Sequence, residues 1–476
     1  MALCPEPIHN EMSGPLPGVD LFVSIDRRDG LRASLERALR DAIADGRLRA
    51  GTRLPPTRVL AQDLGVSRGT VLEAYTQLAS GGWILGRQGS GTVVAEIGVP
   101  ESELASEDAP QEIAWRYDLR EGRPDPTSFP RAAWLRALRR ALTEAPPDAL
   151  GLGDSRGRPE LHEQLAAYLA RARGLRVRPE QIIVTTGFMQ GLNLVARALG
   201  AEGIGSLAME DPCLGFHRAA VAGAGQAIVP LPIDDDGAQV ERLSRETRAV
   251  LLTPNRQHPL GMPLAPARRA LLAEWARGCD GVVIEDDYDG EFRYDGRPIG
   301  ALQGLEPSRV IYAGTASKTL AAGIRLGWLV LPPDLIEPVL GQKRLLDWQT
   351  GALEQLALAE LIRSGEYDRH IRKMRLHYRR RRDLLVRSLR RHVPERSIAG
   401  TSAGLNLFLR TPSVKAEREL LEAAEQRRIR INGLTSNGYP HDPSDRSRAG
   451  LIIGYAASPE HAYPAAVGQL VKAISG

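Results

Sequence analysis

Lys318 stands out because this chain carries almost all of its positive charge on arginine. Of the 62 lysine and arginine residues only five are lysines, and Lys318 is the first of them. It lies in the small-residue segment YAGTASKTLAAGIRLG, directly after a short apolar run. Lysine and arginine serve equally well as surface charge, but only lysine can lose its proton and condense with an aldehyde. A solvated lysine in a turn is the other interpretation, and the neighbouring residues decide between the two.

A carboxylate and a phenol follow another apolar run, GVVI. The next residues, EDDYD, place Asp286 and Tyr288 at the carboxyl end of a predicted strand, where α/β proteins bind ligands. They are two residues apart, so in extended chain their side chains point the same way. With Lys318 they fit pyridoxal phosphate: the acid keeps the pyridine nitrogen protonated, the phenol hydrogen-bonds the 3-oxygen and the lysine forms the Schiff base. A calcium loop that starts at Glu285 is excluded, because Gly296 occupies the position of the bidentate glutamate.

Two segments offer donors for the phosphate of this cofactor. In VTTGFMQGLNLVARAL a strand turns through glycine into a helix, whose first backbone N–H groups can cradle an anion. These groups belong to Gly187, Phe188, Met189 and Gln190. Thr315 and Ser317 add hydroxyl groups before Lys318, and Arg325 follows it as a charged clamp. Each feature alone is typical of an ordinary loop, but together and in this order they predict a pyridoxal phosphate site.

A sheet must hold these side chains. Apolar runs alternate with amphipathic helices over residues 113–476; the runs are QIIVTTG, SLAMEDP, AVLLTPN, GVVIEDDYD, RVIYAGTASK and RLGWLVLP. This alternation predicts an α/β unit around a mostly parallel sheet. From about residue 370 onward, helices and the shorter strands NLFLR and GLIIGYA predict a small C-terminal lobe.

Residues 20–95 follow a different pattern. Three helical segments, GLRASLERALRDAIADGRL, PPTRVLAQDLG and RGTVLEAYTQLAS, precede WILGRQGSGTVVA, which predicts two strands around a glycine-rich turn. This order predicts a winged helix-turn-helix domain, with Ser67 as the N-cap of the third helix. Residues 96–112 contain six acids and no base, and predict a flexible acidic linker to the second unit. Residues 1–22, rich in proline and glycine, are also expected to be flexible.

The third helix and the hairpin carry the residues suited to DNA. Arg68 and Thr70 lie in the first turn of that helix, off its apolar stripe, where a recognition helix meets base edges. Arg53 and Arg58 flank the start of the second helix and are well placed for phosphates. The predicted DNA-binding residues are Arg53, Arg58, Ser67, Arg68, Thr70, Arg87, Gln88 and Gly89, the last three in the wing. A winged helix that serves only protein contacts is the alternative.

The overall composition limits the class of protein but does not indicate a functional site. Hydrophobic residues make up 43% and charged residues 25% of 476, which is typical of a soluble globular protein. Cys4, Cys213 and Cys279 lie far apart, without metal-ligand spacing, so we expect a reducing cytoplasm and no metal. We see neither an apolar run long enough to span a membrane nor the apolar core of a signal peptide.

The segment LPPTRVLAQDLGVSRGTVLEAYTQLASGGWILGRQGSGTVVA resembles the DNA-binding domain of GntR-type bacterial regulators. That resemblance implies DNA contacts for Arg58, Arg68, Thr70 and Gly89. The second half resembles fold-type I aminotransferases, through EGRPDPTSFPRAAWLRALRRAL, TPNRQHPLGMPL, IEDDYDGEFRY and GTASKTLAAGIRLGW. Within the second of these segments the resemblance implies a cofactor role for Asn255.

In this order the two halves resemble the MocR/GabR family of regulators, including its PdxR-like subgroup, which regulates vitamin B6 synthesis or salvage. The resemblance implies a homodimer whose aminotransferase-like part binds pyridoxal phosphate and senses an effector. Such proteins do not carry out metabolic turnover, although residual half-transamination is compatible with the site. A working aminotransferase with an accessory N-terminal module is the alternative.

Two segments depart from the family pattern. Where the family has EDPGY, this chain reads EDPCLGFHR, so Leu214 takes the aromatic position and Phe216 or Phe188 is expected to stack on the cofactor instead. Amino-acid-sensing relatives carry L-R-L-G, whose arginine binds the α-carboxylate of the effector; here Ile452 stands at that position. Arg446 and Arg448, just upstream, are candidate replacements. Since an isoleucine cannot pair with a carboxylate, a B6 vitamer is favoured over an amino acid as effector.

The segment HIRKMRLHYRRRRDLLVRSLRRH is strongly basic. A solvated helix is one interpretation of this charge and a contact with flanking DNA is the other.

Overall fold

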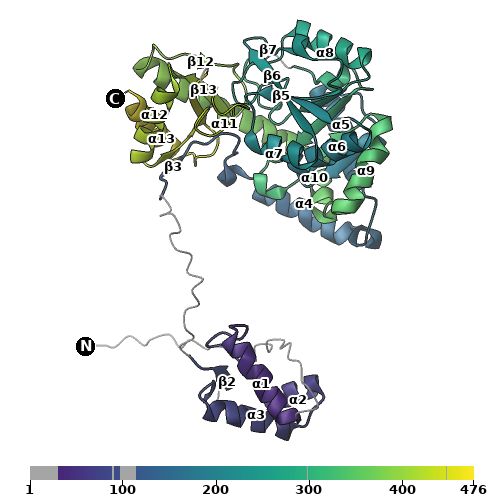
Figure 1. The fold of residues 1–476 in the computed structure, drawn as a ribbon, viewed down its shortest axis with the longest axis vertical. Coiled ribbons are helices and arrows are strands. Elements are labelled where there is room, and N and C mark those ends of the chain that lie inside the picture. Colours follow the sequence, from purple (N-terminus) through teal and green to yellow (C-terminus); the bar gives the residue numbers. More distant parts are fainter. Residues whose placement is uncertain (1–29, 88–90, 97–113, 297–298, 446–447, 476) are drawn as a thin grey trace, which may run out of the picture. The chain divides into compact units, whose positions relative to one another are not determined.

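The computed structural model describes residues 30–87, 91–96, 114–296, 299–445 and 448–475 (Figure 1). The chain forms two compact units, residues 1–112 and 113–476, which are treated separately below. Several predictions fall outside the described residues: those on Gln88, Gly89, Arg446, residues 1–22 and nearly all of the acidic segment 96–112, together with that on the side chain of Arg87.

The first unit has the winged helix-turn-helix fold predicted from the sequence. Its elements are α1 (Leu31–Ala44), α2 (Thr57–Leu64), α3 (Arg68–Ser80), β1 (Ile84–Arg87) and β2 (Gly91–Val94). The strands pair antiparallel as the wing. The predicted apolar stripe of α3 is buried against α1 and α2, and the Ser67 hydroxyl caps α3 by accepting from the Thr70 N–H at 3.1 Å. The opposite side of α3 is therefore left for contacts.

The second unit is built on a large eight-stranded sheet. In spatial order the strands are β4 (Ile182–Thr185), β11 (Gly327–Val330), β10 (Val310–Thr315), β9 (Val282–Asp286), β8 (Ala249–Leu252), β5 (Ser206–Asp211), β6 (Ala227–Asp234) and β7 (Gly237–Ala238). The five strands from β10 to β6 are parallel, whereas β4, β11 and β7 run antiparallel to their neighbours. The prediction of a mostly parallel sheet is confirmed.

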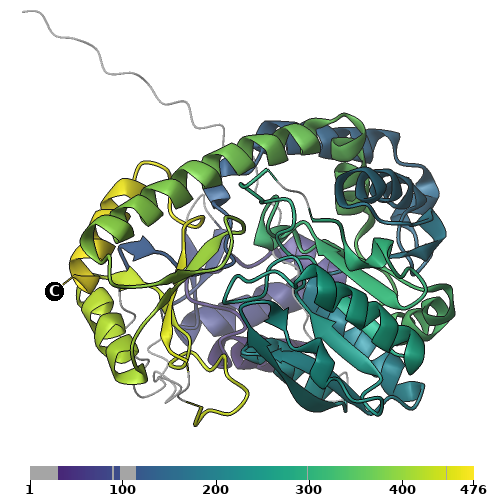
Figure 2. The ribbon, with the colours of Figure 1, turned by 90° about the horizontal axis from the view of Figure 1, so that it is seen from above.

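Helices cover both faces of this sheet (Figures 1 and 2). They are α4 (Arg131–Glu144), α5 (Pro159–Arg173), α6 (Phe188–Ala201), α7 (Gly215–Gly223), α8 (Pro266–Gly278), α9 (Pro333–Leu346) and α10 (Ala352–Arg363). Neighbouring residues of β4 show the two faces: Ile182 packs with α5 and α10, and Ile183 packs with α6 and α9. Because both faces of the sheet are buried, its strands are continuous apolar runs in the sequence.

The small lobe lies beyond the long helix α11 (Glu366–His392), which runs along one edge of the unit from the large lobe (Figure 2). Its antiparallel sheet has the order β12 (Ile398–Ala399), β13 (Asn406–Arg410), β16 (Gly450–Gly454) and β15 (Asn432–Gly433). Helices α12 (Val414–Gln426) and α13 (Tyr463–Ile474) cover it. Strand β3 (Tyr117–Asp118) pairs parallel with β14 (Ile429–Arg430), which fixes the segment before the large lobe against the small one.

Short 3-10 helices complete the chain: η2 (Pro126–Ser128), η3 (Pro147–Leu150), η4 (Pro179–Gln181), η5 (Val240–Arg242), η6 (Leu302–Gly304) and η7 (Ala322–Ile324). Within the ranges that the structure describes, every helix is too short or too polar to cross a lipid bilayer.

Candidate functional site

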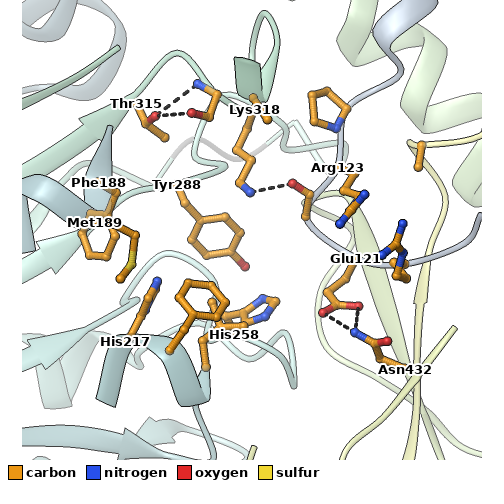
Figure 3. Close-up of a pocket in the computed structure, with 18 of the residues that line it drawn as sticks. Glu121, Arg123, Phe188, Met189, His217, His258, Tyr288, Thr315, Lys318 and Asn432 are labelled. Carbon is orange, nitrogen blue, oxygen red and sulfur yellow. Dashed lines mark hydrogen bonds between the residues drawn. The ribbon is translucent and has the colours of Figure 1, made fainter. Parts of the chain in front are cut away.

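A cavity of about 1210 Å³ opens at the carboxyl edge of the large sheet. Its walls come from residues between 115 and 126, from the ends of β5, β9 and β10, and from residues 430–439 of the small lobe. Figure 3 shows Lys318 reaching between two walls, one with Phe188, Met189 and His217 and the other with Glu121 and Asn432. Of the residues predicted for the cofactor, those that line the cavity are Phe188, Met189, Asp286, Tyr288, Thr315, Ser317, Lys318 and Arg325.

Lys318 is held in the loop that follows β10. The loop is fixed by its own hydroxyl groups: Ser317 N–H donates to Thr315 Oγ1, which in turn donates to Leu326 O, both at 3.1 Å. Lys318 Nζ donates to Gly122 O at 2.5 Å across the cavity. Burial lowers the pKa of the Lys318 amine, and the Asp286 carboxylate only partly opposes this. A neutral amine is the form that attacks a carbonyl carbon.

Asp286 is the last residue of β9, and the register of β9 with β10 sets it opposite Ala313, near the Lys318 loop. Its side chain is buried, and Oδ1 has no hydrogen-bond partner in the described part of the chain. Burial raises the pKa of this carboxyl well above its usual value, and Lys318 acts in the opposite direction. A buried oxygen without a partner is costly, so it fits a ligand that brings a donor, such as a pyridinium N–H.

The Tyr288 hydroxyl is fixed from behind by Arg256. Arg256 Nη1 donates to Tyr288 Oη at 2.9 Å and to Asp289 Oδ2 at 3.3 Å. Arg256 is fully enclosed, and its Nη2 also donates to Asn406 O at 2.6 Å in the small lobe. Burial raises the pKa of Tyr288 well above its usual value, so the phenol stays protonated as a donor. A role for Arg256 was not predicted from the sequence, because the residues that it contacts lie far from it along the chain.

The turn between β4 and α6 forms an anion cradle. Gly187 has φ of 87°, and a Cβ there would lie 2.8 Å from Arg325 Nη2. Arg325, at φ 55°, donates from Nη2 to Thr186 O at 2.9 Å, which holds its guanidinium beside the first N–H groups of α6. The Gln190 side chain turns away: Oε1 accepts from Thr186 N–H at 2.7 Å and Nε2 donates to Asp347. Gly187 and Gln190 can therefore offer a phosphate only their backbone N–H groups.

Gly187→Ala tests this cradle. An alanine at positive φ costs about 1–2 kcal/mol of folding free energy, and its methyl group would displace Arg325. We expect a lower free energy of unfolding in urea and weaker binding of pyridoxal phosphate to the apo-protein. The control is Gly278→Ala at the end of α8, where φ is not positive and a Cβ would meet nothing within 4 Å. Equal behaviour of the two variants would contradict the assignment.

Asn255 does not line the cavity, contrary to the prediction. Its Nδ2 donates to Asp287 Oδ1 at 2.8 Å, and Asp287 is also held by Arg173 Nε at 2.6 Å. The turn after β8 buries Asn255 behind the wall and brings His258 to the cavity instead. Asn255 therefore supports Asp287, while its Oδ1 has no hydrogen-bond partner among the described residues.

Two histidines that line the cavity were not predicted from the sequence. Neither ring nitrogen of His258 has a hydrogen-bond partner within the described residues, and its ring meets Tyr288 edge-on at 5.6 Å. Burial, with Arg256 next, lowers its pKa well below the usual value. Burial likewise lowers the pKa of His217 to about 3. Both rings are therefore neutral near pH 7, with nitrogens that can accept or donate.

Near the segment that departs from the family's EDPGY, two rings lie against each other in the cavity wall. His217 lies 5.0 Å from Phe188, centroid to centroid, and both line the cavity (Figure 3). Phe216 also lines the cavity, but 54% of its side chain is exposed. Leu214 contributes an aliphatic surface beside them. The signal in the sequence was a histidine three residues after Leu214, at the start of a helix that follows a sheet strand.

Ile452 does not reach the cavity. It is fully buried in β16 against Phe408, Leu434 and Tyr439. Arg448, one of the two candidate replacements, lies elsewhere: its Nη2 donates to Ile233 O, and the residue lines a separate pocket of about 310 Å³.

Other polar groups line the cavity as well. Besides Arg325, the arginines in its lining are Arg120, Arg123 and Arg430. Arg120 is paired with Asp118, and the Arg430 guanidinium lies 5.6 Å from the Trp115 ring centroid. Glu121 faces them and accepts from Asn432 Nδ2 at 2.9 Å.

The residues predicted for DNA lie on one unit. Arg53, Arg58 and Arg68 are exposed, and their guanidinium groups have no ion pair among the residues described. Arg68 is the first residue of α3. Thr70 is half-buried and its Oγ1 lies 2.8 Å from Ser67 Oγ, so these two hydroxyl groups shape the helix start. The three arginines are the better candidates for direct contact.

Comparison with known proteins agrees with both units. Residues 31–94 match the family "Bacterial regulatory proteins, gntR family", and residues 118–441 match "Aminotransferase class I and II". An archaeal alanine:glyoxylate aminotransferase of known structure is 28% identical, with a TM-score of 0.66, and 75% of this chain covers 90% of that one. The fold class is thus confirmed for both units, and the cofactor of this class of cavity is pyridoxal phosphate.

Two relatives share the full arrangement. The probable rhizopine catabolism regulatory protein MocR of Rhizobium meliloti is 35% identical over 452 residues, which cover 90% of each chain. The pyridoxine biosynthesis transcriptional regulator PdxR of Corynebacterium glutamicum is 32% identical over 401 residues, 82% of this chain and 86% of that one.

Proposed function

Because the chain belongs to the MocR family of regulators, in which a GntR-type DNA-binding domain precedes an aminotransferase-like domain, we propose that its operator affinity is controlled by pyridoxal phosphate itself. One observation carries this proposal: the chain that presents Arg68 at the start of its recognition helix also contains a cavity that matches this cofactor. The cavity holds Lys318, the anion cradle and Asp286, whose Oδ1 has no partner among the described residues.

The residues divide the work of holding the cofactor. Lys318 Nζ would be the attachment point, Asp286 Oδ1 would accept from the pyridine nitrogen and Tyr288 would donate to the 3-oxygen. The N–H groups at the start of α6 and Arg325 would hold the phosphate. When bound, pyridoxal phosphate supplies an electrophilic carbon and an electron-withdrawing ring. Phe188 and His217 form one wall of the cavity and would keep water from that side of a bound cofactor.

A B6 vitamer suits the cavity better than an α-amino acid. The position that would bind a carboxylate in amino-acid sensors is Ile452, sealed in an apolar cluster. Since Ile452 is not among the residues that line the cavity, that position offers a ligand carboxylate no cation to pair with. The relative that regulates pyridoxine biosynthesis supports the same pathway. An amino-acid effector is the second candidate, since Arg123 and Arg430 also line the cavity.

Titration separates the two effectors. We expect pyridoxal phosphate added to apo-protein to change operator affinity about 5- to 150-fold, the usual range of coupling between two sites. Gel shifts and the absorbance spectrum follow the titration at fixed salt, and a panel of amino acids added to holo-protein is the comparison. If pyridoxal phosphate leaves DNA binding unchanged while one amino acid shifts both signals, the vitamer proposal is wrong.

Regulation rather than turnover is proposed as the main role, and the relatives' names as regulators support this. A working aminotransferase predicts sustained transamination of common amino acids by the purified protein. We also propose a cytoplasmic homodimer. Exposed apolar side chains on two segments joined by the Gly153–Gln349 hydrogen bond favour it, since a contiguous apolar patch often marks a protein interface. They are Leu150, Leu152, Leu345, Leu346 and Trp348.

A further inference from the structure

Helix α11 carries a band of positive charge that the proposed function does not use. From Arg372 to Arg391 it has ten basic residues and a single acid, Asp383. Figure 2 shows α11, in green, along one edge of the second unit. One side of the helix is buried; its inward residues include Ile371, Met374, Tyr378, Arg381, Leu385 and Leu389.

Three of the ten basic residues have partners. Arg375 Nε donates to Glu291 O at 2.8 Å, Arg381 pairs with Asp125 at 3.0 Å, and Arg382 lies 3.7 Å from Asp383. The other seven are exposed, and their side chains have no ion pair or hydrogen bond to any residue that the structure describes. These seven, named the α11 stripe, are Arg372, Lys373, Arg379, Arg380, Arg387, Arg390 and Arg391.

The stripe has the shape of a single face. At 3.6 residues per turn its seven members fall within a sector of about 120°, and they extend over about 29 Å of helix. Leu376 and Asp383 are the other residues in its centre, and Asp383 is turned to Arg382. One turn of duplex DNA is about 34 Å long and carries one phosphate charge per roughly 1.7 Å of axis.

We propose that the α11 stripe binds the phosphate backbone of DNA flanking the sequence read by α3, which adds affinity without base specificity. The proposal rests on the proposed function, because α3 selects the duplex that the stripe then contacts. Unpaired arginines on one face match phosphates in charge. The 17 residues 97–113 between the two units span at most about 60 Å, enough to reach the next turns of one duplex.

The experiment compares two duplexes and three proteins. One duplex is the operator core alone, and the other carries the same core with flanks of unrelated sequence. The test variant is Arg379→Gln/Arg380→Gln/Arg387→Gln. The control variant, Arg197→Gln/Arg242→Gln/Arg245→Gln, removes the same charge from exposed arginines of the large lobe that form no ion pair with the described residues. All affinities are measured over a salt series, and the cofactor spectrum checks folding.

Wild-type and control proteins should bind the flanked duplex about tenfold more tightly than the core, and the test variant should lose this gain. Its log–log salt slope on the flanked duplex should fall by about 3, one per lost phosphate contact, with core binding unchanged. No gain from flanks in wild type, or equal behaviour of test and control variants, overturns the proposal. Binding to vesicles that contain phosphatidylserine is measured as well. If the test variant loses affinity for these vesicles but not for the flanked duplex, the proposal is also overturned. Failure of wild type to bind the core at all would instead contradict the proposed function.

Discussion

Lys318→Ala protein should purify without the visible absorbance of bound cofactor and should retain no pyridoxal phosphate after borohydride treatment. The reason is chemical: the cavity offers Asp286, Tyr288 and the α6 cradle for contacts, but only the lysine amine can join the cofactor covalently. In the wild-type protein borohydride should fix the cofactor on this residue. Peptide mapping after reduction provides the measurement.

Four other lysines could in principle carry the borohydride label, so the mapping can distinguish Lys318 from each of them. They are Lys343, Lys373, Lys415 and Lys472. Lys343 is buried, is paired with Asp347 at 2.9 Å and is not among the residues that line the cavity. Lys373 is exposed, so Lys373→Ala is the matched control. Lys318→Arg keeps the charge near Gly122 O and should still fail to attach the cofactor. Label on any lysine other than Lys318 would refute the assignment.

The pH dependence of attachment follows from the environment of Lys318. Burial lowers the pKa of its amine, so the neutral, reactive form appears at a lower pH than for a free lysine. The rate of cofactor attachment to apo-protein should therefore rise with pH and level off below pH 10.5, the ordinary value.

Arg68→Ala should abolish specific operator binding while leaving the cofactor spectrum intact. Arg68 is exposed at the first position of α3, its charge has no partner in the described residues, and Ser67 and Thr70 fix the helix start beneath it. Loss of a bidentate base contact costs about 1–3 kcal/mol, roughly one to two decades in affinity. Gel-shift titration at fixed salt with operator and scrambled duplexes gives the specificity ratio.

Arg49→Ala is the control for Arg68, because Arg49 is an exposed arginine of the same unit outside α3. We expect it to change affinity for operator and scrambled DNA equally, if at all, since phosphate contacts carry no base information. An unchanged specificity ratio in the Arg68 variant would show that α3 does not read bases through this residue.

Local pattern was enough for most of the fold. The 3.6-residue spacing of Val71, Ala74, Tyr75 and Leu78 predicted the buried face of α3, and the fully apolar runs predicted strands covered on both sides. Lys318, Asp286 and Tyr288 were found because each stands at the end of an apolar strand, and in a parallel sheet such ends meet at one edge.

Contacts between distant segments were not predictable in this way. Glu121 meets Asn432 across 311 positions of sequence, and Arg256 reaches Asn406 across 150. Asn255 was predicted in the site, but the turn after β8 points it to Asp287 and brings His258 forward. A one-residue change in such a turn reverses which side chain faces a ligand, and no periodicity reports it.

The sequence by itself therefore determined two units, their order and the lysine, acid and phenol that meet in one cavity as the proposed cofactor site, because helix and strand spacing and strand-end chemistry are local properties. Only the tertiary structure decided which polar groups complete the cavity: the neutral His217 and His258, the enclosed Arg256 and the Glu121–Asn432 pair. It also separated the partnered from the unpartnered arginines of α11. Burial and pairing depend on chain crossings, and these set the pKa values and free charges on which function rests.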